Sequence, residues 1–147
     1  MSAGRTAGVS STQTTFRLLL GAFLVVAGSS HLLWSRAEFL AQVPAWLPVD
    51  GDLVVVLSGA VEIVLGAALL LAARLRVLVG LITAAFFVAI FPGNIAQLVE
   101  ATDTFGLDSD TARAVRLVFQ PVLVAWALWS TGSWRALRLL RQQGEVH

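Results

Sequence analysis

Apolar residues fill four long stretches of this chain, and polar residues collect in the segments between them. Each stretch comes close to the roughly 20 residues that a helix needs to cross the hydrocarbon core of a bilayer. The pattern therefore predicts an all-α integral membrane protein, an antiparallel four-helix bundle over residues 16–134. The four stretches run from Phe16 to Trp34, from Leu53 to Ala73, from Leu75 to about Leu98 and from Ala114 to Trp129.

The two ends of the chain are polar. Residues 1–15 are small and polar, which predicts a flexible cytoplasmic tail that ends in a helix cap at Thr14 or Thr15. A cleaved signal peptide is the alternative for this end. Residues 135–147 predict a basic cytoplasmic tail.

The connections differ in length and character. The turn at residues 73–76 is so short that the helices on either side of it should be antiparallel neighbours. In the first outer connection, Pro44 and Pro48 stiffen an apolar insert around Trp46, which predicts either a lid or an anchor at the membrane interface. In the second outer connection, Asp108 or Ser109 is expected to cap the fourth helix.

Composition and charge sharpen this picture. With 57% hydrophobic and 13% charged residues and a mean hydropathy of +0.81, the chain has too little polar surface for a soluble domain of this size. Cysteine is absent, which excludes disulfides, thiol redox catalysis and thiolate metal sites. Arginines at the two ends and the short turn predict a plasma-membrane protein with both termini in the cytoplasm. They are Arg5, Arg17, Arg74, Arg76, Arg135, Arg138 and Arg141.

Glu62 is the one charged residue within the second apolar stretch. Hosting a carboxylate in hydrocarbon costs at least about 3 kcal/mol, so Glu62 is expected to be protonated or to face partners inside the bundle. Gly59 and Gly66 lie one turn to either side of it. The first stretch carries a similar small-residue stripe, Gly21 and Gly28, with His31 after it, and we expect these two faces to meet.

Polar residues of the other stretches should converge on the same level. Cα–Cβ bonds tilt toward each helix's N-terminus, which brings one polar side chain from every span to the outer half of the bilayer. Metal ligands are not expected, and no catalytic residue is assigned. The candidate ligand-binding residues are His31, Glu62, Asn94, Gln120, Arg116 and Trp46.

Each candidate also has an interpretation without a ligand. Asn94 and Gln120 could simply tie helices together, and Asn94 could satisfy a carbonyl freed by Pro92. His31 could cap a helix end or lie at the interface. Arg113 and Arg116, which share a face with Gln120, could extend to the interface. Glu62 is the residue for which a purely structural role is least expected.

The chain resembles the DoxX-like membrane proteins through a series of short motifs between Gly21 and Trp129. The resemblance implies a four-helix membrane protein with His31, Glu62, Asn94 and Gln120 at motif positions. Family members include a small subunit associated with archaeal thiosulfate:quinone oxidoreductase. The motifs are Ala27-Gly-Ser-Ser-His31, Val43-Pro-Ala-Trp-Leu-Pro48, Ser58-Gly-Ala-Val-Glu62 with Leu65-Gly66, Phe91-Pro-Gly-Asn94 and Arg116-Leu-Val-Phe-Gln-Pro121.

These observations favour a binding subunit for a lipophilic, quinone-like molecule in a membrane redox system. No redox metal is expected, because the chain offers one intramembrane histidine, no cysteine and no carboxylate pair. We therefore expect an accessory subunit of a quinone-linked oxidoreductase and not an enzyme on its own. The alternatives are a non-catalytic assembly factor for a membrane-protein partner or a small proton-coupled transporter. The lipid bilayer and a further copy of the chain are the other expected partners, and nucleic acid is not.

Overall fold

The computed structural model describes residues 8–100 and 109–145, which form helices and no strand. The all-α prediction is therefore confirmed for these ranges. Four helical segments are long and apolar enough to cross a membrane: Ser11–Leu33, Gly51–Leu71, Ala73–Val99 and Asp110–Ser130. The elements are α1 (Ser11–Leu33), α2 (Arg36–Leu40), α3 (Gly51–Leu71), η1 (Ala73–Leu75), α4 (Arg76–Ala89), α5 (Phe91–Val99), α6 (Asp110–Ser130) and α7 (Ser133–Gly144).

The first helix begins earlier than the sequence predicted. Ser10 caps α1 by accepting a hydrogen bond from the backbone of Gln13, whose side chain in turn accepts from the backbone N–H of Ser10. The expected cap at Thr14 or Thr15 is wrong, because this reciprocal pair satisfies the helix start before either threonine is reached. The cap expected at Ser109 is confirmed, and Asp108 lies outside the described residues.

The third apolar segment is two helices. α4 ends at Ala89 and α5 begins at Phe91, directly before Pro92. Proline has no backbone N–H and its ring crowds the preceding turn, so the helix breaks here. One turn before the break, Nε2 of Gln120 donates to the carbonyl of Phe87 at 2.6 Å.

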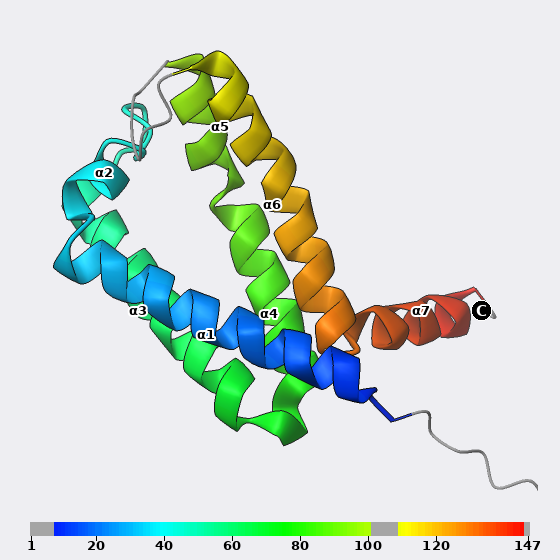
Figure 1. Cartoon of the computed structure of the whole chain (residues 1–147). Coiled ribbons are helices and arrows are strands. Elements are labelled where there is room, and N and C mark those ends of the chain that lie inside the picture. The colour runs from blue at the N-terminus through cyan, green and yellow to red at the C-terminus, as the bar shows by residue number, and fades with distance from the viewer. Residues whose placement is uncertain (1–7, 101–108, 146–147) are drawn as a thin grey trace, which may run out of the picture.

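The long helices form two pairs that meet at one end and diverge toward the other (Figure 1). α1 packs along α3, and α6 packs along α4 and α5. α3 and α4 contact each other near η1, as the short turn predicted, and separate beyond it. α3 packs mainly against α1, and α4 packs mainly against α6. The core at the junction consists of Leu20, Leu24, Leu65, Leu69, Val79, Ala84, Phe87, Leu123 and Ala127.

The glycine stripes of α1 and α3 meet, as expected. A Cβ atom on Gly28 would lie 2.5 Å from the carbonyl oxygen of Gly59, and one on Gly66 would lie 2.6 Å from the carbonyl oxygen of Gly21. Small residues at such a contact let two helix backbones approach closely. This close approach places His31, one turn after Gly28, beside Glu62, which lies between Gly59 and Gly66.

Charged residues separate along the molecule. Most of the described arginines lie at the end where η1 and α7 lie, while most of the described acids lie at the end of α2 and α5 (Figure 1). Arg36 and Asp52 form a two-point ion pair at the acidic end. The arginines of the first group are Arg17, Arg74, Arg76, Arg135, Arg138 and Arg141, and the acids are Glu38, Asp50, Asp52, Glu100 and Asp110.

Candidate functional site

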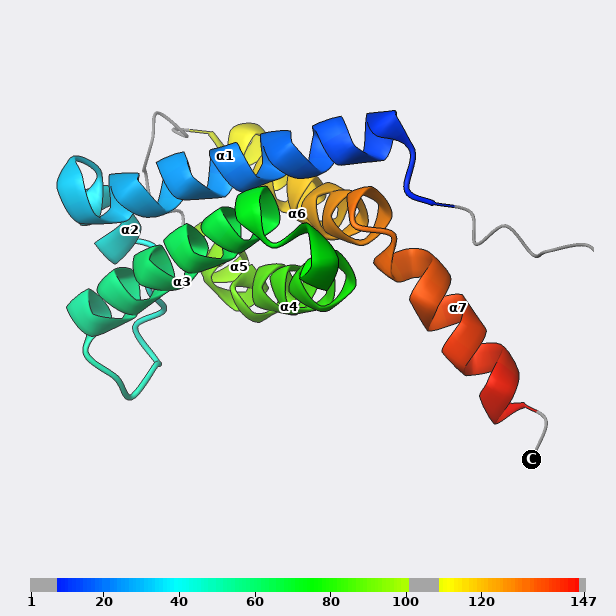
Figure 2. The same cartoon turned by 90° about the horizontal axis from the view of Figure 1, so that it is seen from below.

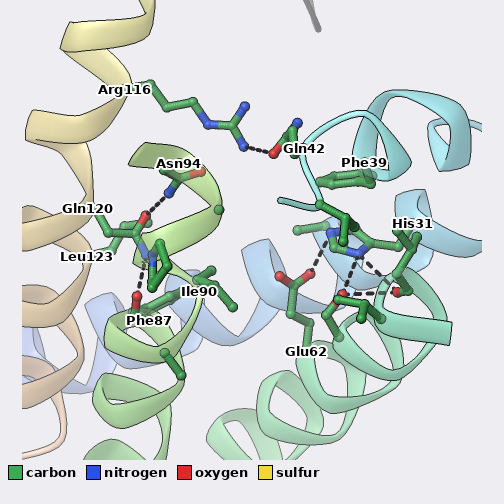
Figure 3. Close-up of a pocket in the computed structure, with 18 of the residues that line it drawn as sticks. His31, Phe39, Gln42, Glu62, Phe87, Ile90, Asn94, Arg116, Gln120 and Leu123 are labelled. Carbon is green, nitrogen blue, oxygen red and sulfur yellow. Dashed lines mark hydrogen bonds and ion pairs between the residues drawn. The ribbon is translucent and has the colours of Figure 1, made fainter. Parts of the chain in front are cut away.

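A cavity of about 720 Å³ lies between the two helix pairs where they diverge. Most of its wall is apolar, with side chains that include Leu24, Phe39, Val55, Phe87, Phe119 and Leu123. All six residues predicted from the sequence line it: His31, Trp46, Glu62, Asn94, Arg116 and Gln120. They do not form the single cluster that the sequence suggested. Figure 3 shows two polar groups on facing walls.

His31 and Glu62 form the polar group on the wall of α1 and α3 (Figure 3). Both residues are only 6% exposed. Nε2 of His31 lies 3.5 Å from Oε2 of Glu62, and Nδ1 lies 3.2 Å from the hydroxyl of Ser58 and 3.4 Å from the carbonyl oxygen of Val55. The ring of Phe39 covers the imidazole, with centroids 3.4 Å apart.

These contacts indicate how the protons of His31 are arranged. The carbonyl of Val55 can only accept, and the Ser58 hydroxyl donates to that same carbonyl at 3.0 Å. With its own proton directed at Val55, the Ser58 oxygen can only accept a hydrogen bond from His31. Both neighbours of Nδ1 are therefore acceptors, and Nδ1 is the protonated nitrogen. In the neutral imidazole, Nε2 then carries the lone pair and faces Glu62. A proton between Nε2 and Oε2 can belong to either residue.

Oε2 of Glu62 has no hydrogen-bond partner among the residues that the structure describes. Its distance of 3.5 Å to His31 exceeds the usual 2.7–3.2 Å of a hydrogen bond. A buried polar atom that lacks a partner costs about 1–3 kcal/mol, and more when the group is charged. Oε2 is itself covered by protein, but the Glu62 side chain lines the cavity, so a rotation of the carboxyl group would let a molecule inside the cavity supply the missing hydrogen bond.

Asn94 and Gln120 form the second polar group on the opposite wall (Figure 3). Nδ2 of Asn94 donates to Oε1 of Gln120 at 3.0 Å, and Gln120 donates to the Phe87 carbonyl. The pair thus joins α4, α5 and α6. This geometry supports the helix-tying interpretation of both residues and not a repair of the Val88 carbonyl by Asn94.

Arg116 spans the mouth of the cavity. Its guanidinium donates to Oε1 of Gln97 on α5 at 3.0 Å and to Oε1 of Gln42 in the connection after α2 at 2.7 Å. The second bond links the two helix pairs across the gap (Figure 3). Trp46 is 66% exposed at the rim. Sequence reasoning missed Gln42 and Gln97, although Gln97 follows Asn94 by one helical turn and Gln42 is a polar residue in an apolar connection.

The sequence matches the family described as a domain of unknown function, DUF8561, over residues 20–131. The chain belongs to this family. The DUF8561 match contains every cavity residue named above and ends before α7 begins. No curated protein and no solved structure matches the chain.

In this DUF8561 chain, we expect Gln42→Ala to loosen the mouth of the cavity. The substitution removes the side-chain oxygen that accepts a hydrogen bond from the Arg116 guanidinium. A hydrogen bond to a charged group contributes about 1.5–3 kcal/mol. Hydrogen exchange of residues 41–47, followed by mass spectrometry, should accelerate about tenfold. Gln142→Ala, on the exposed face of α7, is the matched control and should leave this segment unchanged. Equal protection in all three proteins would show that the bond does not hold the connection in place.

Proposed function

We propose that this chain is a multi-pass protein of the cell membrane, an antiparallel four-helix bundle with both termini in the cytoplasm. Four helices of sufficient length and apolarity support the membrane location. The gathering of arginines near η1 and α7 supports the orientation, because segments rich in arginine stay on the cytoplasmic side. In this orientation the cavity lies in the outer half of the bilayer.

We propose further that the cavity binds a lipophilic molecule with a polar, quinone-like head. The observation that carries this proposal is that Glu62, a buried acid whose Oε2 has no partner among the described residues, lines a largely apolar cavity. The volume of 720 Å³ falls within the roughly 300–1,000 Å³ of small-molecule sites. A bound carbonyl or hydroxyl group would complete the hydrogen bonding of Glu62, and the apolar wall would hold the tail.

His31 and Glu62 are suited to handle a proton at such a head group. Both side chains line the cavity, so a rotation of the Glu62 carboxyl group could carry a proton between the His31–Glu62 pair and a ligand oxygen. Electrons would come from a partner, so the chain would act as an accessory subunit of a quinone-linked oxidoreductase. Membership of the DoxX-like family and a role in membrane redox systems stay predictions.

The other two functions also stay predictions. An assembly factor could not dock its partner on the glycine stripes of α1 and α3, because these pack against each other. A docking role would therefore need another surface. A proton-coupled transporter would use Glu62 as its proton site, and substrate-driven proton movement in reconstituted vesicles would identify it.

Filling the cavity tests the binding proposal. Ala27 lines the cavity and carries none of its polar groups, so Ala27→Phe should weaken binding of decylubiquinone at least about tenfold by overpacking the tail site. Binding can be measured by native mass spectrometry of protein purified in mild detergent. Ala22→Phe adds the same ring to an exposed position of α1 and should bind normally. If the two variants bind alike, or if the unmodified protein does not bind the quinone, the proposal fails.

A further inference from the structure

Helix α7 has two faces of different chemistry. Arg135, Arg138 and Arg141 recur every three residues on one side. Leu137 and Leu140 lie on the opposite side and are 40% and 64% exposed. The guanidinium of Arg138 lies 5.5 Å from the ring centre of Trp134, so the aromatic residue borders the basic face. A short helix with basic residues on one side and exposed leucines on the other is typical of a membrane surface.

The start of α7 is fixed to the helices that precede it. Gly132 adopts a φ of 78°, which turns the chain sharply out of α6. The hydroxyl of Ser133 donates to the Val77 carbonyl at 2.9 Å and lies 2.7 Å from the hydroxyl of Thr131. A Cβ atom on Gly80 would overlap Thr131, so α4 approaches this corner closely. The direction in which α7 leaves is therefore set by packing.

That direction carries α7 away from the long helices and at a steep angle to α6 (Figures 1 and 2). The last candidate span ends at Ser130 and α7 begins at Ser133. Only Thr131 and Gly132 separate the two, so the start of α7 lies within about 11 Å of the end of that span. Arg74 and Arg76 lie at the same end of the molecule (Figure 1). The helix thus starts at the depth where lipid head groups would lie.

We propose that α7 lies flat on the membrane and binds the head groups of anionic phospholipids. The inference rests on the proposed membrane location but not on any ligand of the cavity. Leu137 and Leu140 would enter the boundary between head groups and acyl chains, and the three arginines would extend to phosphates. α7 contains no acidic residue. Glu145, the residue directly after it, pairs with Arg141 at 3.6 Å. This charge balance favours a negatively charged surface.

The absence of native cysteine allows a single label to report the position of α7. Full-length Leu140→Cys protein carrying a nitroxide would be reconstituted in nanodiscs of phosphatidylcholine with or without phosphatidylglycerol. With the anionic lipid, the label should become accessible to oxygen and shielded from a water-soluble nickel complex. A Gln142→Cys label on the polar side should stay accessible to nickel in both lipids.

Variants of the three arginines distinguish binding to anionic head groups from membrane contact through the leucines alone. Replacing Arg135, Arg138 and Arg141 with glutamine should shift the equilibrium toward detached α7 by roughly 10- to 100-fold, and replacing them with lysine should restore it. A label at position 140 that stays in water in both lipids would overturn the proposal, as would shielding that does not depend on charge. So would spin–spin broadening that shows a second copy covering α7. Failure of the protein to enter nanodiscs would instead count against the membrane location.

Discussion

The Gly28→Ala variant is expected to lose roughly 2–3 kcal/mol of its free energy of unfolding. The added methyl group would lie 2.5 Å from the carbonyl oxygen of Gly59 and 2.9 Å from Cβ of Glu62. Neither is the free end of a flexible side chain, so α1 and α3 must move apart. Thermal or SDS-induced unfolding of the protein in mild detergent measures the loss.

The separation should also disturb the cavity, because His31 and Glu62 face each other across the same contact. Gly8→Ala is the matched control, since a Cβ atom at this residue would contact nothing within 4 Å. It should unfold as the unmodified protein does. If Gly28→Ala were equally stable, the close packing of the two glycine stripes would be refuted.

The Glu62→Gln variant is expected to fold normally but to bind decylubiquinone about tenfold more weakly. Glutamine has nearly the same size as glutamate and removes the penalty of a buried, unpartnered carboxyl oxygen, so stability should be kept or improved. It cannot exchange a proton with His31 or with a ligand. In infrared difference spectra, the carboxyl band that changes when quinone is added should disappear from the variant.

Two comparisons make this result specific. Glu100→Gln removes an exposed carboxylate outside the cavity and should leave binding and the ligand-induced infrared change intact. The His31→Gln variant tests whether His31, which faces Glu62, takes part in binding. If the two residues share one proton, the double variant should bind no more weakly than the weaker single variant. Normal quinone binding by Glu62→Gln would remove the main support for the proposed site.

Sequence patterns were sufficient to predict those features of the fold that depend on a single helix or on one pair of helices. The four apolar stretches gave the candidate spans, because length and hydropathy are local properties. The glycine stripes predicted that α1 and α3 meet, since a missing side chain marks a place for close approach. The tilt of Cα–Cβ bonds then brought His31 and Glu62 to a common level, and the structure places them together.

What the sequence could not supply is the angle between the two helix pairs. Polar residues at one depth can touch only if their helices are close there, and the pairs diverge at this level. Asn94 and Gln120 consequently bond to each other and not to Glu62. Gln42 was missed for the same reason, because its bond to Arg116 joins segments 74 residues apart across that divergence.

The break at Ile90 has a consequence for how cavities in related chains can differ. α4 holds the tightly packed junction through Val79, Ala84 and Phe87, whereas α5 carries Asn94 and Gln97 as a separate nine-residue piece. Substitutions that shift or rotate α5 would reshape one wall of the cavity and leave the junction untouched. Diversification of ligand preference can thus proceed on a small part of the chain, at little expense to the folding of the rest.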